Sequence, residues 1–126
     1  TALHDANGLV LGPEEQEPDL TIVVVNNDGG AIFSLLEQGA DDYADAFERV
    51  FGTPHGVDLA AWCGATQTPH ARTGSVAAAL DAILDPRGSG IRVVELRTDR
   101  AAVARVRRDL RESIRAAVPP ALDDNA

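Results

Sequence analysis

Residues 20–30 read LTIVVVNNDGG, an uninterrupted apolar run that stops at a polar, glycine-containing turn. A run of this kind, rich in β-branched residues, is typical of a strand buried on both faces of a parallel sheet. Residues 90–97 contain a second such run, and residues 66–72 form a weaker candidate. We therefore predict a parallel sheet in which residues 20–25 form a strand covered on both faces.

Helical patterns surround these strands. The expected helices cover residues 1–12, 31–36, 59–64, 75–84 and 100–118. Asp58 and Asp99 stand where N-caps belong. The acidic residues 37–45 predict a surface loop, although Tyr43, Phe47 and Phe51 recur at a helical spacing that places them on a core. Alternating strands and helices indicate an α/β fold with helices on the faces of the sheet.

Composition narrows the class of protein. The chain has 126 residues, a formal net charge of -9 and one cysteine, so it fits one small domain without a disulfide framework. With a single cysteine, a reducing, cytoplasmic setting is expected. We expect binding to neither nucleic acid nor membranes, since the charge is acidic and no apolar run approaches the roughly 20 residues of a membrane span. Nine arginines against four acids in residues 86–116 favour a solvated helix surface over an anion-binding face.

The turn after the first strand is the place for chemistry, because ligands of open α/β sheets bind at the carboxyl ends of strands. The amide oxygen of Asn27 and the main-chain carbonyl of Gly29 could supply two of the oxygen ligands that Mg²⁺ prefers. An ordinary turn after a strand has the same composition. From the residues alone both interpretations stay open, and two neutral ligands would need a carboxylate beside them.

Other candidate groups favour structural roles. His55 is expected to order its loop rather than carry protons, and Cys63, beside Trp62 on a predicted helix, is expected to be a buried thiol rather than a nucleophile. His4 and His70 have no partner at a spacing that suggests a metal site.

Three stretches together resemble one enzyme family. VVVNNDGGAIFSLL (23–36), FGTPHGVDLAAWCGA (51–65) and IRVVELRTDR (91–100) are similar to the C-terminal part of 2-succinyl-5-enolpyruvyl-6-hydroxy-3-cyclohexene-1-carboxylate synthase, the thiamine-diphosphate enzyme of menaquinone biosynthesis. The resemblance implies a three-layer, parallel-sheet thiamine-diphosphate-binding fold, truncated at its N-terminal edge. Residues 1–118 would form the thiamine-diphosphate and Mg²⁺-binding domain, and residues 119–126 a frayed tail.

The resemblance also implies the site residues. Asn27 would bind Mg²⁺ through its side chain and Gly29 through its carbonyl, and Mg²⁺ would hold the cofactor diphosphate. A third ligand in the family comes from a Gly-Asp pair, which we expect upstream of Thr1. The remaining positions implied for the cofactor are Thr1 and Ala2, at the start of a helix facing the diphosphate, then Gly30, and the apolar Ile32, Phe33 and Leu36. Packing of those three apolar side chains on a core is an equally good interpretation.

The function implied is that of a transferase. The complete enzyme would decarboxylate 2-oxoglutarate and add the succinyl semialdehyde unit to isochorismate. This chain would anchor the cofactor, contain no catalytic residue and be inactive alone; its partners would be the remaining domains of a homo-oligomeric parent. The alternatives are another thiamine-diphosphate carboligase or decarboxylase domain, and a non-catalytic α/β interaction module.

Overall fold

The computed structural model describes residues 2–86 and 89–118. The chain divides into two compact units, and each is described by itself. The first consists of residues up to 29 together with 54–98, and the second of residues 30–53 together with those from 99 onward. The expected tail, 119–126, lies outside the described residues.

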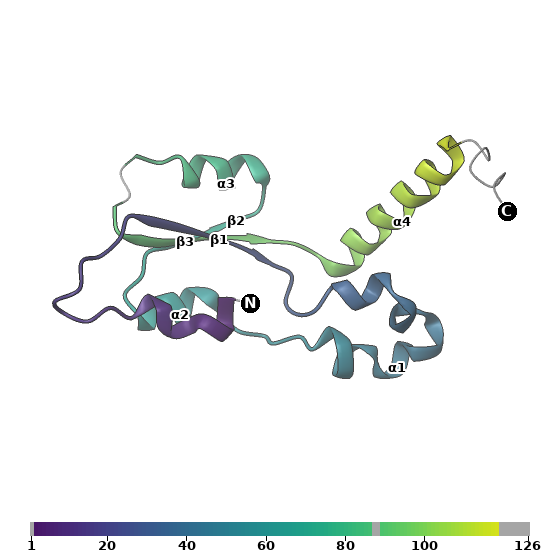
Figure 1. Cartoon of the computed structure of the whole chain (residues 1–126), viewed down its shortest axis with the longest axis horizontal. Helices are drawn as coiled ribbons and strands as arrows, with labels where there is room; N and C mark the ends of the chain where they lie inside the picture. Colours follow the sequence, from purple (N-terminus) through teal and green to yellow (C-terminus); the bar gives the residue numbers. More distant parts are fainter. Residues whose placement is uncertain (1, 87–88, 119–126) are drawn as a thin grey trace, which may run out of the picture. The chain divides into compact units, whose positions relative to one another are not determined.

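The first unit is built on a three-stranded parallel sheet (Figure 1). Its strands are β1 (Leu20–Asn26), β2 (His70–Thr73) and β3 (Ile91–Arg97), in the spatial order β1-β3-β2. Both neighbours of β3 run parallel to it. The predicted α/β class and the parallel sheet are confirmed. The weak strand expected over residues 66–72 forms later, at β2, because Thr66 ends the preceding helix.

Helices cover both faces of this sheet (Figure 1). The 3₁₀ helix η1 (Ala2–Leu9) and α2 (Leu59–Ala65) lie on one face, and α3 (Val76–Ile83) lies on the other. The predicted cap at Asp58 is confirmed, since its carboxylate accepts a hydrogen bond of 2.9 Å from the Ala60 N–H. The first helix, expected over residues 1–12, is a 3₁₀ helix over Ala2–Leu9 that is kinked at Asp5, and residues of low helix propensity, Asn7 and Gly8, follow the kink closely.

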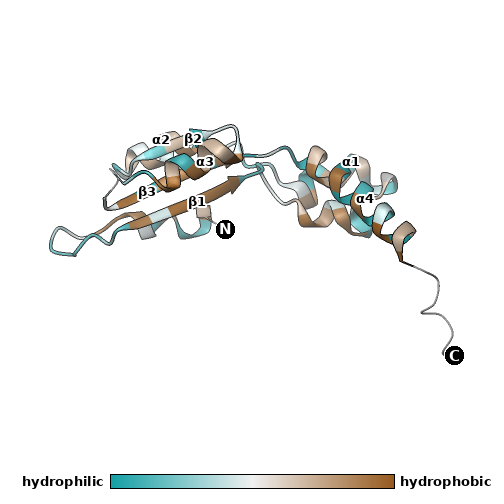
Figure 2. Ribbon diagram, turned by 90° about the horizontal axis from the view of Figure 1, so that it is seen from above, coloured by the Kyte–Doolittle hydropathy of each residue, from teal (hydrophilic) through white to brown (hydrophobic). Residues whose placement is uncertain are grey.

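The core of the first unit lies between the sheet and the two helices η1 and α2 that cover one of its faces. It is formed by Leu9, Cys63, Ile91 and Val93, with Ile22, Val24 and Trp62 packed against it. Figure 2 shows the corresponding hydrophobic colouring along β1 and β3. Cys63 is fully buried, which confirms the structural thiol predicted from the sequence.

The prediction that the first strand is covered on both faces is wrong. β1 lies at the edge of the sheet, and Leu20, Val23 and Val25 are all exposed, Val25 to 61%. The strand with neighbours on both sides is β3, where Val93 and Val94 are buried. An apolar run identifies a strand from local sequence, whereas its place in the sheet depends on pairings between distant residues.

The second unit consists of short helical turns and one long helix. The turns are η2 (Ile32–Leu35), η3 (Glu37–Gly39), η4 (Asp41–Tyr43), α1 (Ala44–Phe47) and the π-helical η5 (Glu48–Gly52), and the long helix is α4 (Arg100–Ala117). The surface position expected of residues 37–45 is confirmed, since most of them are exposed, but the expected loop is wrong. Successive backbone hydrogen bonds, such as Ala40 N–H to the Glu37 carbonyl at 3.0 Å, close it into helical turns.

Aromatic contacts and a helix cap organise this second unit. Phe51 packs against Phe33 and Phe47, with ring centroids 5.2 Å and 6.0 Å away, while Tyr43 is exposed instead of lying on a core as expected. The predicted cap of the long helix is confirmed, because the Asp99 carboxylate accepts a hydrogen bond from the Ala102 N–H. Within residues 2–86 and 89–118, none of the helices has the length and apolar character needed to cross a bilayer.

Candidate functional site

The turn that follows β1 has an unusual backbone. Asp28 has a φ of 55° and Gly29 a φ of 140°. Glycine adopts such values at no steric cost, and aspartate tolerates the left-handed region better than most residues. The turn therefore brings the chain sharply out of the sheet at the carboxyl end of β1, where sequence analysis placed the candidate site.

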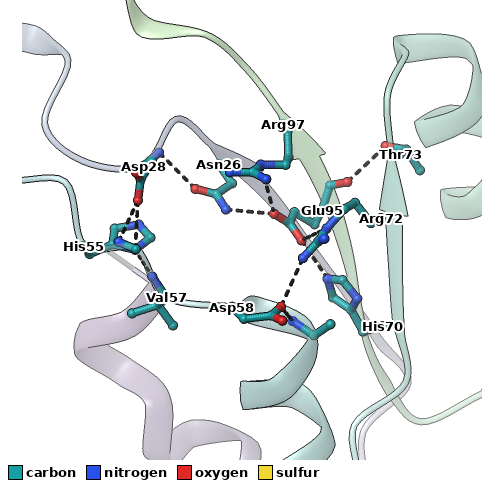
Figure 3. Close-up of polar contacts among 12 residues, drawn as sticks. Asn26, Asp28, His55, Val57, Asp58, His70, Arg72, Thr73, Glu95 and Arg97 are labelled. Atoms are coloured by element: carbon teal, nitrogen blue, oxygen red, sulfur yellow. Dashed lines mark hydrogen bonds and ion pairs between the residues drawn. The ribbon is translucent and has the colours of Figure 1, made fainter.

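The two asparagines of this turn have different roles. Asn26 is buried and both ends of its amide are occupied: Nδ2 donates to Glu95 Oε1 at 2.8 Å, and Oδ1 accepts from the Asp28 N–H at 3.0 Å (Figure 3). Across the described residues, no hydrogen-bond partner is found for the Asn27 amide. Of the pair, Asn27 is therefore the residue whose amide oxygen is available to a ligand.

The Asp28 carboxylate is directed to the loop that precedes α2. Its Oδ1 accepts from the Gly56 N–H at 2.9 Å and lies 3.4 Å from His55 Nδ1 (Figure 3). His55 Nδ1 in turn accepts a hydrogen bond of 3.0 Å from the Val57 N–H. These contacts confirm the loop-ordering role predicted for His55.

Beside the turn lies a buried carboxylate that sequence analysis missed. Glu95 on β3 is 1% exposed, and its Oε2 receives hydrogen bonds of 3.0 Å from His70 Nε2 and Arg72 Nε on β2 (Figure 3). Arg72 also bonds Asp58 Oδ1 at 3.1 Å, which ties β2 to the start of α2. The available signal was alternation, because Glu95 shares a face of its strand with Ile91 and Val93.

The surroundings of Glu95 keep it ionised. Burial raises the pKa of the Glu95 carboxyl, but the hydrogen bonds from Asn26, Arg72 and His70 outweigh it and leave the pKa below its usual value. The pKa of Arg72 is raised, first by its hydrogen bond to Glu95. Burial, with Glu95 as a second cause, raises the pKa of the Cys63 thiol, which makes it a poor nucleophile.

The residues of the turn fit part of a magnesium site. Asn27 and Gly29 offer hard oxygen donors, the kind that Mg²⁺ prefers. The Asp28 carboxylate is engaged by the neighbouring loop, and the part of the chain that the structure describes contains no group of three His, Cys, Asp or Glu side chains suited to a metal ion. A complete site would need further oxygen donors from outside these residues.

The other predicted cofactor residues divide between the two units. Thr1 lies outside the described residues, and Ala2 is the first residue of η1. In the second unit, the Gly30 N–H donates to the Gly52 carbonyl at 2.7 Å. Two of the apolar candidates of that unit are not packed on a core there, since Ile32 is 66% and Leu36 53% exposed. Phe33 is 37% exposed and packs against Phe51.

Comparison with known proteins identifies relatives that share one name. No family model matches the chain. It is 59% identical over 120 residues to the 2-succinyl-5-enolpyruvyl-6-hydroxy-3-cyclohexene-1-carboxylate synthase of Nocardioides sp., covering 94% of this chain and 21% of the relative. Proteins of the same name from Saccharopolyspora erythraea and Thermobifida fusca are 50% and 54% identical, covering 94% and 92% of this chain and 21% and 20% of the relatives.

The chain thus spans about a fifth of the length of the curated relatives it matches. The resemblance predicted from three stretches of sequence extends along nearly the whole chain. This chain is therefore similar to the C-terminal part of the 2-succinyl-5-enolpyruvyl-6-hydroxy-3-cyclohexene-1-carboxylate synthases.

Proposed function

We propose that this chain is the diphosphate-anchoring segment of a thiamine-diphosphate-dependent synthase. The complete enzyme would decarboxylate 2-oxoglutarate and add the succinyl semialdehyde unit to isochorismate. The observation that carries the proposal is 59% identity, over 94% of this chain, to a protein with that synthase's name. The turn after β1 supports it, because two hard oxygen donors stand at the carboxyl end of a parallel strand.

Each candidate residue has a definite task under this proposal. Asn27 and Gly29 would hold Mg²⁺, with the remaining ligands supplied by the diphosphate, by water and by a carboxylate of another segment. The first residues of the chain, Thr1 and Ala2, would face the diphosphate. Gly30 and the apolar Ile32, Phe33 and Leu36 would contact the rest of the cofactor. When bound, thiamine diphosphate supplies the electron sink for decarboxylation, and the protein supplies position and electrostatics.

The proposal places the remaining machinery elsewhere. Residues 1–118 would form part of a three-layer thiamine-diphosphate-binding domain within a homo-oligomeric enzyme. The groups that activate the cofactor and bind the substrate carboxylates would belong to other domains, so this chain alone would be inactive. Measurable conversion of 2-oxoglutarate and isochorismate by the isolated 126-residue chain would contradict that statement.

A chimera tests the proposal directly. The matching 120 residues of the Nocardioides synthase are replaced with this chain, and thiamine diphosphate binding is measured by calorimetry with and without Mg²⁺. We expect Mg²⁺-dependent binding and synthase activity. Asn27→Ala should weaken binding at least roughly tenfold, because it removes a metal ligand. Asn7→Ala, which changes an exposed asparagine of η1, is the matched control and should bind like the unmodified chimera.

The same experiment tests the non-catalytic alternative. A folded chimera that binds no thiamine diphosphate would refute the anchoring role and favour a non-catalytic interaction module. Another thiamine-diphosphate carboligase or decarboxylase is distinguished on the full-length protein instead, because the substrate-binding groups of the chimera belong to the Nocardioides synthase. A substrate screen on the full-length protein that carries this chain would then identify the reaction.

A further inference from the structure

Burial of the charged Glu95 side chain on the central strand is unfavourable in free energy. Glu95 lies on this strand with 1% of its surface exposed, directly after the buried apolar residues Val93 and Val94. Transferring a carboxylate from water to the protein interior has a desolvation penalty of roughly several kcal/mol, even when hydrogen-bond donors surround it. A charge at such a position calls for an explanation beyond packing.

The two carboxylate oxygens of Glu95 face different parts of the first unit (Figure 3). Oε2 accepts hydrogen bonds from His70 Nε2 and Arg72 Nε, and these bonds join β3 to β2. Oε1 receives Asn26 Nδ2 at 2.8 Å, at the end of β1. The first side holds two strands together, whereas the second is the start of a chain of hydrogen bonds leading out of the sheet.

This series of hydrogen bonds ends in residues 26–30, the turn that contains Asn27 and Gly29 and that we call the magnesium turn. A carboxylate can only accept, so it fixes the Asn26 amide with its NH₂ toward Glu95 and its oxygen toward the turn. The Asn26 oxygen then accepts from the Asp28 N–H at 3.0 Å. This bond holds Asp28 at a φ of 55°, a value that most residues avoid, and Asp28 separates Asn27 from Gly29.

We propose that Glu95 is a positioning residue for the magnesium turn: through the Asn26 amide it fixes the backbone that carries Asn27 and Gly29. The inference rests on the proposed function, because it gives that turn a ligand. Groups that orient metal ligands without touching the metal typically change metal affinity about 10- to 100-fold when they are removed. Glu95 would act less directly than such groups, because it contacts neither ligand and influences them only through Asn26 and the backbone of the turn.

The competing explanation is that Glu95 only clamps β3 to β2. A double-mutant cycle distinguishes the two. Glu95→Leu removes the acceptor, Asn26→Leu removes the relay and leaves the bonds to β2 in place, and the double variant removes both. Arg72→Gln is the control, because it cuts a bond to Oε2 and leaves the Oε1 side intact.

The measurement is made on the full-length protein that carries this chain. Mg²⁺ is titrated calorimetrically at saturating thiamine diphosphate, and the melting temperature of every variant is recorded. We expect Glu95→Leu and Asn26→Leu each to weaken Mg²⁺ binding about tenfold or more. The double variant should bind Mg²⁺ no more weakly than Asn26→Leu alone. If Glu95 acts on the turn only through the Asn26 amide, its removal has no further effect once that amide is gone. Arg72→Gln should lower the melting temperature and leave the Mg²⁺ affinity unchanged.

Three results would overturn the positioning role. They are wild-type affinity in folded Asn26→Leu, wild-type affinity in folded Glu95→Leu, and losses that multiply in the double variant. If Glu95→Leu fails to fold, Asn26→Leu still decides the question. Failure of the proposed function looks different, because the unmodified protein would then show no Mg²⁺-dependent cofactor binding at all.

Discussion

Replacing Glu95 with glutamine should destabilise the first unit, and the loss should depend on pH. In the native protein Oε2 accepts hydrogen bonds from Arg72 and His70. A glutamine whose oxygen stays with Asn26 turns its NH₂ group toward these two donors, so both bonds are lost. Hydrogen bonds to a charged group contribute about 1.5–3 kcal/mol each. Because the Arg72 side chain is 45% exposed and regains water, we expect a total loss near the lower bound, about 3 kcal/mol at pH 7.

The pH dependence follows from the direction of the pKa shift. The pKa of Glu95 is lower in the folded chain than its usual value, so the ionised carboxylate stabilises the fold above the unfolded-state pKa of about 4.3. That contribution is lost as the pH falls through the folded-state pKa. Glutamine has no such titration. The difference between the two proteins should therefore be largest near neutral pH and shrink in acid.

Urea unfolding followed by tryptophan fluorescence provides the assay. Trp62 is the only tryptophan and packs against the core of the first unit, so its emission reports on the correct part of the chain. Glu112→Gln, on the exposed surface of α4, changes the net charge equally and should have almost no effect. A Glu95→Gln loss below about 0.5 kcal/mol, or one that persists undiminished in acid, would refute the reasoning.

Two further predictions concern other parts of the chain. Gly30→Ala would place a Cβ 2.6 Å from the Phe51 carbonyl oxygen, so we expect the second unit to lose about 1–3 kcal/mol, seen as faster proteolysis within residues 30–53; wild-type cleavage rates would contradict this. Cys63 is fully buried and its thiol pKa is raised, so a disulfide reagent should modify it roughly a hundredfold more slowly in the folded chain than in denaturant; equal rates would show that the thiol is accessible.

Local signals in the sequence predicted the helix starts and the turn correctly. Asp58 and Asp99 cap helices by accepting from N–H groups two and three residues further along, a contact that depends only on neighbouring residues. Asn27 and Gly29 were selected from a local signal too, a turn that follows directly on a strand, and their role as metal ligands stays a prediction. The structure adds that the Asn26 side-chain amide makes a hydrogen bond at its nitrogen and another at its oxygen.

The features that sequence analysis missed depend on pairing between distant residues. The edge position of β1 follows from the order of three strands, which no single run encodes. The contacts of Glu95 follow from register, which sets it opposite Val24 on one side and Arg72 on the other. A charged residue within an apolar strand suggests an exposed face when it is considered alone, but its alternation with Ile91 and Val93 was the evidence for burial.

The two faces of the Glu95 carboxylate also explain why an apolar residue would be a poor substitute. Replacing a buried charge network with well-packed apolar side chains is often neutral or favourable for stability. Stability alone therefore gives little reason for a carboxylate between Val94 and Leu96. Only the Oε1 side leads to the turn, and only an acceptor there can dictate which way the Asn26 amide faces. If the turn holds Mg²⁺ as proposed, the energetic penalty of burying Glu95 is offset in the bound state, where a fixed backbone reduces the entropy lost on binding.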